Sequence, residues 1–350
     1  METPESADCV VVGAGAVGCA VALGLASQGL STVIVDRAGA FAEASGAAAG
    51  ILAPQIEATG PGPWLDLALA SRARWPEFVN SLDDVVGWRA EGAIEIGDDR
   101  ELGARAAWQE ALGLPVERLD ARSLVTLERA LAPLEESQIA LRFGGAAQID
   151  PPLLRKALVA AMQRKGARLL IASVRRIDRH PRVTGVVLSD GRRIATGRVV
   201  LAAGAWSPLV EGAPPLAVKP MRGELIELAG PRLLVKHVVF ARGGYLVSRE
   251  DGRVVVGSTM EDVGFDRSTT AAARALLLER ARAMVPALAG ASVLRVWAGL
   301  RPVAIDGPYL GASGVPGLVL ATGHGRNGIL LAPITAERVL AAVLAPDGVH

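Results

Sequence analysis

The sequence predicts an α/β protein with two domains. Its 350 residues exceed the usual size of a single hydrophobic core. Near the N-terminus an apolar run, a glycine-rich turn and a helical pattern follow one another, which is typical of the strand–helix–strand units of parallel sheets. From residue 209 to residue 299 short strand patterns predominate, and these predict an antiparallel sheet that carries one helix.

The first strand–helix–strand unit carries a nucleotide-binding pattern. Gly13, Gly15 and Gly18 follow a buried apolar strand with the spacing G-x-G-x-x-G. This spacing permits a tight turn, close approach of the backbone to a pyrophosphate, and close packing of the helix on the strand. Asp36 ends the next strand, where its carboxylate can accept hydrogen bonds from both hydroxyls of an adenosine ribose. We therefore predict a dinucleotide site; the alternative is a glycine-rich packing motif without a ligand.

A second segment of small side chains follows between residues 42 and 58. Ser45 and Gly46 precede the run Ala-Ala-Ala-Gly at residues 47–50, which allows a flat, extended cofactor to lie directly on the backbone. The Ser45 hydroxyl can bind a phosphate oxygen. The alternative is an alanine-rich helix start with Ser45 as its N-cap.

The rest of the chain alternates between helical and strand patterns. A helix, a return strand, a hairpin and a buried strand between residues 148 and 208 repeat the strand–helix–strand order of the N-terminal unit, so we expect them in the same domain. Helices are expected at residues 63–82, 151–165 and 270–284, with two more before residue 134, and short strands are expected between residues 85 and 96.

Composition excludes several classes of protein. Lys and Arg number 37 against 36 Asp and Glu, so no net field favours nucleic acid or an anionic membrane. Cys9 and Cys19 are the only cysteines, and both fall in an apolar segment, which argues against a disulfide framework and for a reducing compartment. No leader pattern, long apolar span, metal-ligand spacing or nucleophile elbow is visible. We expect a cytoplasmic protein without a metal or a membrane anchor.

Six stretches resemble one known family. They are "VVVGAGAVG", "SGAAAGILAPQIE", "LAAGAWS", "GRVVVGSTM", "WAGLRPVAIDGPYLG" and "GHGRNGILLAP". They are similar to the D-amino acid oxidase family of FAD-dependent amine oxidoreductases, and within it to the bacterial glycine oxidases. The resemblance spans essentially the whole chain.

This resemblance implies a fold and a domain division. The fold is an FAD-binding Rossmann-like domain with a second antiparallel-sheet substrate domain, as in D-amino acid oxidase. Residues 1–82, 148–208 and 300–350 are assigned to the discontinuous FAD-binding domain, and residues 83–147 and 209–299 to the substrate domain. A homo-oligomer is also expected.

The resemblance further implies the residues that bind FAD. Ala16 and Val17 would contact the pyrophosphate, Asp36 and Arg37 the adenosine, and the turn from His324 to Leu330 the isoalloxazine. A helix beginning near Gly328 would direct its N-terminus at the flavin. The full set is Gly13, Gly15, Ala16, Val17, Gly18, Asp36, Arg37, Ala44, Ser45, Ala49, Gly50, Ile51, Val174, Gly204, His324, Gly325, Arg326, Asn327, Gly328, Ile329 and Leu330. Because no cysteine follows Cys19, the FAD is expected to be non-covalent.

Three residues are candidates for contact with the substrate. Arg301 resembles the family's clamp on the substrate carboxylate, and Tyr245 and Arg326 would lie beside it. A guanidinium can grip a carboxylate through two parallel hydrogen bonds, which would orient the Cα hydrogen toward flavin N5. The alternatives are a surface arginine before a proline turn and a packed hairpin tyrosine.

These features predict an FAD-dependent amino acid oxidase. Glycine and other small primary or secondary amines, including sarcosine and small D-amino acids, would give an imine and then a 2-oxo acid, with molecular oxygen reduced to H2O2. Thiazole formation in thiamine biosynthesis is the expected setting. The alternatives are a D-amino acid dehydrogenase that uses another acceptor and, from a different class, a non-catalytic FAD-binding assembly protein.

Overall fold

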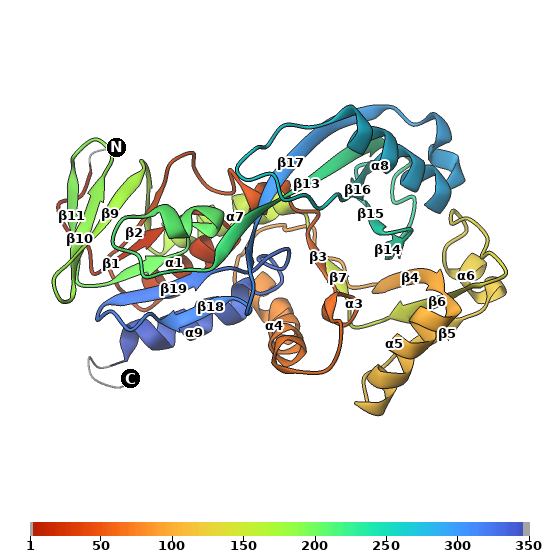
Figure 1. Cartoon of the computed structure of the whole chain (residues 1–350), viewed down its shortest axis with the longest axis horizontal. Coiled ribbons are helices and arrows are strands. Elements are labelled where there is room, and N and C mark those ends of the chain that lie inside the picture. Colours follow the sequence, from red (N-terminus) through yellow and green to blue (C-terminus); the bar gives the residue numbers. More distant parts are fainter. Residues whose placement is uncertain (1–2, 346–350) are drawn as a thin grey trace.

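The computed structural model describes residues 3–345 and shows two large sheets in the two halves of an elongated molecule (Figure 1). Two 12-residue strands, β13 (Val218–Ala229) and β17 (Val293–Ala304), extend from one half toward the other. Their length brings the end of the second sheet next to the glycine-rich turn of the first, so the space between the sheets is bounded by both.

The first sheet has six strands in the order β18-β19-β12-β1-β2-β8. Four of its five strand pairings are parallel, and the fifth, between β18 and β19, is antiparallel. The strands are short and almost fully buried, as the continuous apolar runs predict. They are β1 (Cys9–Val12), β2 (Thr32–Asp36), β8 (Arg168–Ile171), β12 (Val199–Leu201), β18 (Tyr309–Ala312) and β19 (Leu318–Thr322).

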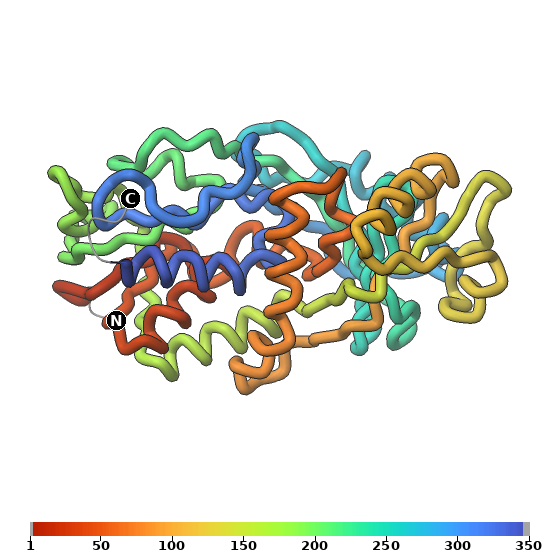
Figure 2. The backbone as a smooth tube through the Cα atoms, turned by 90° about the horizontal axis from the view of Figure 1, so that it is seen from below, coloured from red at the N-terminus to blue at the C-terminus, as the bar shows by residue number. Residues whose placement is uncertain are grey.

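Three helices cover one face of this sheet. α1 (Ala16–Ser27) packs against both α7 (Pro151–Arg164) and α9 (Ala332–Leu344), and these lie side by side in Figure 2. On the other face lies a three-stranded sheet made of β9 (Val174–Arg179), β10 (Val183–Leu188) and β11 (Arg193–Ala195). Both faces are therefore covered, and the chain forms a doubly covered parallel sheet from segments far apart in sequence.

The second sheet has eight strands in the order β17-β13-β16-β15-β14-β4-β6-β5. All neighbours are antiparallel except β14 and β4, which are parallel, so the predicted antiparallel sheet contains one parallel pair. These two strands come from separate stretches of the chain, and no hairpin fixes their relative direction. The strands besides β13 and β17 are β4 (Ala93–Asp98), β5 (Glu117–Leu119), β6 (Gln138–Phe143), β14 (Val238–Ala241), β15 (Gly244–Ser248) and β16 (Arg253–Gly257).

Helices on this sheet agree with the sequence pattern. They are α5 (Asp99–Ala111), α6 (Ala121–Leu127) and α8 (Ala271–Met284). The Thr270 hydroxyl caps α8 by accepting from the Ala273 amide, and the Asp98 carboxylate caps α5. The remaining elements connect the sheets: α2 (Ala44–Ala47), β3 (Ile51–Leu52), α3 (Pro54–Glu57), α4 (Pro63–Asn80), β7 (Ala147–Gln148), η1 (Gly204–Leu209) and η2 (Pro286–Gly290).

Two sequence predictions about local structure are wrong. The last helix begins at Ala332 and not near Gly328, because Pro333, whose missing amide suits a first turn, sets the helix start. The residues before it form an irregular turn in which the amides of Asn327 and Leu331 donate to the carbonyls of His324 and Asn327. Of the strands expected between residues 85 and 96, only β4 forms, beginning at Ala93.

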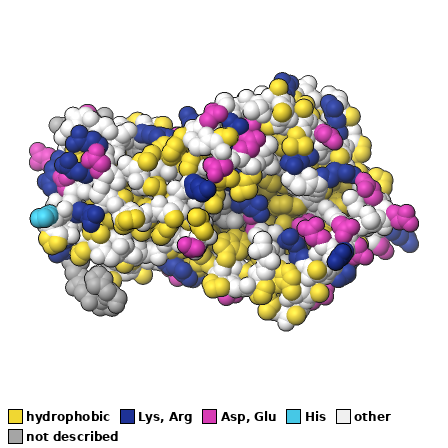
Figure 3. All heavy atoms as spheres, in the orientation of Figure 1, with side chains coloured by type: hydrophobic (Ala, Val, Ile, Leu, Met, Phe, Trp, Pro, Cys, Tyr) yellow, Lys and Arg dark blue, Asp and Glu magenta, His cyan; other side chains and the backbone are white. Residues whose placement is uncertain are grey.

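The domain division stays a prediction, because β17 runs continuously across the proposed boundary at residue 300. Within residues 3–345, none of the helices has the length and apolar character needed to cross a bilayer. The face drawn in Figure 3 intersperses basic with acidic side chains, in keeping with the balanced composition.

Candidate functional site

A cavity of about 1000 Å³ lies between the two sheets. Its walls come from the β1–α1 turn, the segment from α2 to β3, the start of η1, the facing strands β13 and β17, and the turn before α9. The cavity thus extends from the carboxyl ends of the parallel strands to the second sheet, which is where ligands of open α/β folds bind.

The glycine-rich turn is closed against its neighbours so tightly that side chains would not fit. Gly13 has φ +105°, and a Cβ there would lie 2.4 Å from the Ala202 carbonyl oxygen. A Cβ on Gly18 would lie 1.9 Å from the Gly13 carbonyl oxygen, which accounts for the close packing of α1 on β1. Gly15 lines the cavity, and a Cβ on it would approach the Ser45 hydroxyl at 3.1 Å. Gly13 and Gly15, which line the cavity, therefore leave the backbone accessible to a ligand.

The Asp36 carboxylate is already largely used by the protein. Its Oδ2 accepts from the Ala14 amide at 2.8 Å, and its Oδ1 accepts from the amides of Ala38 at 2.9 Å and Gly39 at 3.1 Å. An ionised carboxylate accepts about four hydrogen bonds, so capacity remains for about one ribose hydroxyl and not for two. Asp36 lines the cavity, and its contact with the adenosine ribose stays a prediction.

Aromatic and charged groups close the same end of the cavity. The Arg37 guanidinium stacks over the Trp206 ring, 3.9 Å from its centroid, and donates to Glu43 at 2.5 Å. Glu43 also pairs with Arg267, which comes from the second half of the chain, at 2.8 Å. Trp206 packs on Phe265 at 5.3 Å between ring centroids. The two parts of the chain therefore meet over the end of the cavity at which the adenosine is predicted.

Ser45 binds the neighbouring helix and is not the cap of its own. α2 follows Glu43, and the Ser45 Oγ accepts from the Ala16 amide at 2.9 Å across 29 residues of chain. The alternative with Ser45 as an N-cap is therefore wrong, because the residue lies inside the helical turn. The hydroxyl instead satisfies a first-turn amide of α1, beside the place where the pyrophosphate is predicted.

The segment after α2 presents its amides to the cavity. Among residues 3–345 no acceptor is found for the backbone amides of Ala48, Ala49 or Gly50, although Ala49 and Gly50 are buried. Gly50 has φ +73°, and a Cβ there would lie 1.9 Å from the Ile149 carbonyl oxygen. Buried amides without partners are rare in folded proteins, so a ligand that accepts hydrogen bonds fits this wall.

Arg301 lies on β17 and projects over the neighbouring strand. Its guanidinium donates to the Thr259 carbonyl at 3.1 Å and to the Ser258 hydroxyl at 2.6 Å. Gly223 makes room for it, since a Cβ there would lie 2.1 Å from Arg301 Nη1. Burial lowers the pKa of Arg301 from its ordinary value, but a guanidinium stays charged at neutral pH. Among residues 3–345 no carboxylate pairs with it, so the cavity holds an uncompensated cation.

Tyr245 lies beside Arg301 at the cavity wall. It is directly opposite Gly257 in the β15–β16 pair, and a Cβ on Gly257 would lie 2.4 Å from the phenol oxygen. Burial raises the pKa of the Tyr245 phenol, while the Arg301 charge acts in the opposite direction. The phenol is therefore protonated at neutral pH and can donate a hydrogen bond.

The turn before α9 also lines the cavity. His324 is buried, its Nε2 lies 3.0 Å from the Thr335 hydroxyl, and burial lowers its pKa to about 4. The Arg326 guanidinium forms a close ion pair with Glu57, whose Oε2 also accepts from Asn327 Nδ2 at 3.4 Å. The neutral imidazole and the paired arginine leave Arg301 as the principal positive charge near the second sheet's end of the cavity.

Most of the predicted residues line this cavity, but three do not. Ala16 and Gly18 lie under the glycine turn, and the Leu330 side chain is in the core while its carbonyl accepts from Ser71 and Trp75. The predicted residues that line it are Gly13, Gly15, Val17, Asp36, Arg37, Ala44, Ser45, Ala49, Gly50, Ile51, Val174, Gly204, Tyr245, Arg301, His324, Gly325, Arg326, Asn327, Gly328 and Ile329.

Several wall residues were not predicted individually. Glu57 ends the stretch "SGAAAGILAPQIE", and Ser258, Thr259 and Met260 belong to "GRVVVGSTM", so the motifs that contain them could have indicated them. Glu95 and Arg105 line the far end from β4 and α5 and lie in no recognisable motif. No group of side chains suited to a metal ion is found among residues 3–345.

Comparison with known proteins identifies the family. The family described as FAD dependent oxidoreductase matches residues 8–342. Glycine oxidase of Geobacillus kaustophilus is 33% identical over 342 residues, covering 94% of this chain and 90% of the relative. Glycine oxidase of Pseudomonas aeruginosa is 34% identical over 356 residues, covering 96% and 94%. The crystal structure of the Geobacillus kaustophilus enzyme superposes with a TM-score of 0.91 at 31% identity, over 97% of this chain and 95% of that one.

A longer relative shows the same similarity over part of its length. The bifunctional protein ThiO/ThiG of Nostoc is 34% identical over 346 residues, which are 95% of this chain and 52% of the relative. The chain thus spans about half the length of the bifunctional relatives that it matches. The matched family covers nearly the whole chain, and the glycine turn, the free amides and the cavity fit an extended dinucleotide: the chain belongs to the FAD-dependent oxidoreductase family, and FAD is its cofactor.

Proposed function

We propose that this protein oxidises glycine and other small primary or secondary amines, including sarcosine and small D-amino acids, with oxygen as the electron acceptor. The observation that carries the proposal is Arg301, a largely buried cation in the cavity that no carboxylate of the described chain neutralises. An unpaired buried charge is costly, so a site that maintains one is suited to an anionic ligand. The similarity to glycine oxidases supports the choice of an amino acid carboxylate.

The chain's own residues orient the substrate. Arg301 can bind the carboxylate through two hydrogen bonds, and Tyr245 can donate a third. We place the flavin along the segment from Ala48 to Gly50, which lines the same cavity as Arg301, so a carboxylate fixed at Arg301 restricts how the Cα hydrogen can face the flavin. Bound FAD supplies the redox chemistry, in which two electrons and the Cα hydrogen leave as hydride, the amine becomes an imine, and oxygen is reduced to H2O2. Hydrolysis of the imine gives the 2-oxo acid and releases ammonia from a primary amine or an alkylamine from a secondary amine.

No base at Cα is required for this reaction. The His324 imidazole, with its lowered pKa, is neutral and buried against Thr335, which makes it part of the wall and not an acid at neutral pH. Charge that accumulates on the reduced ring can instead be stabilised by the backbone amides of the cavity wall. The substrate contacts that we propose are Arg301, Tyr245 and Arg326. Of these, Arg326 already forms an ion pair with Glu57.

The bifunctional ThiO/ThiG relatives support a role in thiamine biosynthesis, with this chain equivalent to the part that it matches. We also propose a homo-oligomer in the cytoplasm. A purely structural FAD-binding protein is disfavoured because Arg301 serves no contact that a structural cofactor needs.

A substrate panel tests the proposal. Purified protein should form peroxide with glycine, sarcosine and small D-amino acids. Arg301→Met should lower kcat/KM about 100-fold or more while FAD stays bound, since stranding a desolvated carboxylate costs about 3–5 kcal/mol. Arg274→Met, an exposed residue of α8, is the control for loss of a positive charge. Dye reduction without peroxide would replace the oxidase with a dehydrogenase, and no turnover of any amine would overturn the proposal.

A further inference from the structure

Arg249 is a buried cation behind the proposed flavin site. It follows β15 in the turn that leads to β16, and only 5% of it is exposed. Its Nη2 donates to the Ala49 carbonyl at 2.5 Å, and its Nη1 donates to the Gln148 side chain at 3.1 Å. Its Nε is buried without an acceptor. Arg249 does not line the cavity, whereas Ala49 does, so a single layer of backbone separates the guanidinium from the cavity.

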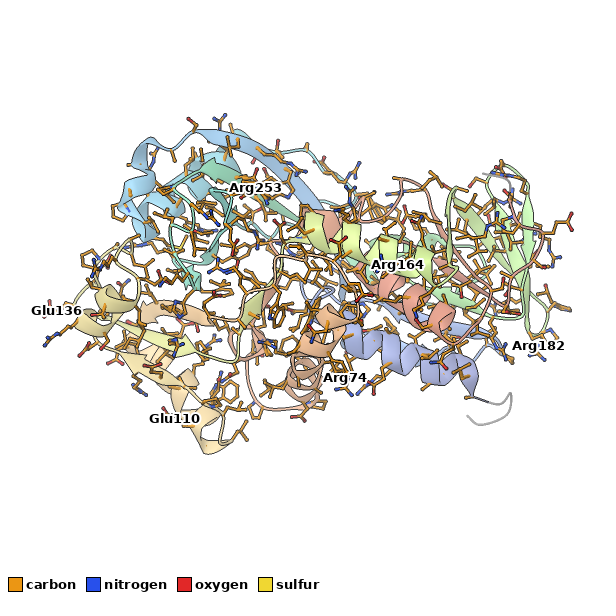
Figure 4. The ribbon with its side chains drawn as sticks, turned by 180° about the vertical axis from the view of Figure 1, so that it is seen from behind. Arg74, Glu110, Glu136, Arg164, Arg182 and Arg253 are labelled. Atoms are coloured by element: carbon orange, nitrogen blue, oxygen red, sulfur yellow. The ribbon has the colours of Figure 1, made fainter. Side chains whose placement is uncertain are left out.

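Among residues 3–345, no carboxylate forms an ion pair with this cation. The nearby acid is Asp150, whose Oδ2 pairs with Arg253 Nη2 at 2.5 Å and whose Oδ1 has no partner. Arg253, labelled in Figure 4, projects from β16 and also pairs with Asp251. Burial lowers the pKa of Arg249 to about 10, which still leaves it protonated at neutral pH. The positive charge is therefore retained inside the protein without an ion pair of its own.

The contact between Arg249 and the Ala49 carbonyl fixes the orientation of the backbone at Ala49 and Gly50. The Ala49 carbonyl is directed at Arg249, and the Gly50 carbonyl accepts from the Ile149 amide at 2.8 Å. Because a trans peptide directs its C=O and the following N–H to opposite sides, the Ala49 carbonyl bound by Arg249 turns the Gly50 amide the other way, and this amide has no acceptor among residues 3–345. Carbonyl oxygens that turned into the cavity would repel the electron-rich reduced flavin, so the outer contacts determine the electrostatics of the wall.

We propose that Arg249 is a positioning residue that, through the Ala49 carbonyl, holds the Gly50 amide toward the flavin and favours its reduced form. The inference rests on the proposed placement of the flavin along this segment. A guanidinium one backbone layer from the ring acts through a medium with few water molecules, where a charge has a long reach. The anionic reduced ring gains more from it than the neutral oxidised ring does.

Two substitutions separate charge from packing. Arg249→Met keeps the length of the side chain and removes the charge and the hydrogen-bond donors. Arg249→Lys keeps the charge with fewer donors. The control is Arg232→Met. The Arg232 side chain is 79% exposed, so this substitution removes the same charge from the surface. The measurements are the FAD dissociation constant of each reconstituted apoprotein and the midpoint potential of its bound flavin.

Arg249→Met should weaken binding of reduced flavin about tenfold more than binding of oxidised flavin. Tenfold corresponds to a midpoint potential lower by about 30 mV for a two-electron couple. Arg249→Lys should recover most of the potential, and Arg232→Met should match the wild type. If Arg249→Met weakens both redox states equally, or leaves both unchanged, the proposal is wrong. If it does not fold, the Lys variant decides: because lysine keeps the charge, a midpoint potential about 30 mV or more below that of Arg232→Met overturns the proposal. Since no measurement uses turnover, failure here is distinct from failure of the proposed amine oxidation.

Discussion

Replacing Gly223 with alanine should displace the Arg301 guanidinium without touching the arginine itself. A Cβ on Gly223 would lie 2.1 Å from Nη1, 2.2 Å from Nη2 and 2.3 Å from Cζ of Arg301. The Gly223 backbone is not in the left-handed region, so alanine adds no backbone strain. The steric conflict with Arg301 is therefore the whole effect of the substitution.

The size of the displacement follows from these distances. Non-bonded carbon contacts are comfortable at about 3.5 Å, so the guanidinium must move by more than about 1 Å. That movement breaks the hydrogen bonds to Ser258 at 2.6 Å and Thr259 at 3.1 Å. Misplacing a binding group by about 1 Å costs about 100-fold in rate. We expect kcat/KM for glycine to fall about 100-fold, with a stability cost of about 1–3 kcal/mol for the added methyl group.

The assay compares Gly223→Ala with Gly290→Ala, a position with open space around the added Cβ. Steady-state oxidation gives kcat/KM, and titration with acetate, which has a carboxylate but no amine, reports the anion site through the flavin absorbance. Both variants should retain FAD, and only Gly223→Ala should weaken acetate binding. If kcat/KM and acetate affinity of Gly223→Ala stay within twofold of the wild type, Arg301 does not hold the carboxylate where we place it.

Three further predictions concern the cofactor and the turn before α9. Acid precipitation should release all flavin as FAD, because Cys9 and Cys19 are buried away from the cavity; flavin in the pellet would contradict this. Gly328→Val should weaken FAD binding about tenfold or more. Gly328 lines the cavity, and the nearest protein atom to a Cβ there is on His324 at 3.8 Å, so the added side chain would occupy space predicted for the flavin. An unchanged dissociation constant would show that this turn does not contact the flavin. Burial lowers the pKa of His324 to about 4, below its value of about 6.5 in the unfolded chain. The unfolded state therefore takes up the proton first, and the free energy of unfolding falls as the pH drops from about 6.5 toward 4. Urea unfolding of the apoprotein at pH 7 and pH 5 should show a loss of about 2 kcal/mol from this residue that is missing in His324→Asn; parallel profiles would refute it.

The sequence predicted those features whose cause is local. The glycine spacing, the buried apolar strands and the helix stop at Gly166 depend on neighbours along the chain, and the structure has the first two strands, α1 and α7 where the pattern places them. The cofactor and the family were predicted from motifs, and the comparisons confirm both. The predicted start of α9 was wrong because the turn with three glycines resembles the N-terminus of a helix. In the structure the regular helix begins at Ala332, next to Pro333.

Features set by contacts between distant segments could not be predicted. Ser45 binds an amide 29 residues away, and Arg249 binds a carbonyl 200 residues away. In the sequence, Ser45 resembles a cap and Arg249 resembles an exposed residue of a hairpin turn. The parallel pairing of β4 with β14 likewise joins segments that no local turn connects. Only the folded chain shows which partner each group meets.

The glycine pair Gly223 and Gly299 connects the two proposed halves of the site. These residues lie directly opposite each other in β13 and β17, so they share a face of the sheet. On that face the Ala47 methyl group of α2 would be 2.5 Å from a Cβ on Gly299, and the Arg301 guanidinium covers Gly223. Trp297 Nε1, also on β17, donates to the Ala47 carbonyl at 3.0 Å. Ala47 of α2 and the Arg301 guanidinium, which we propose binds the carboxylate, therefore pack on two opposing glycines. The register of β13 with β17 sets the distance between them. A shift of one residue in β17 would turn Arg301, Gly299 and Trp297 to the opposite face together, so the proposed substrate orientation and the support of Ala47 both depend on this strand pairing.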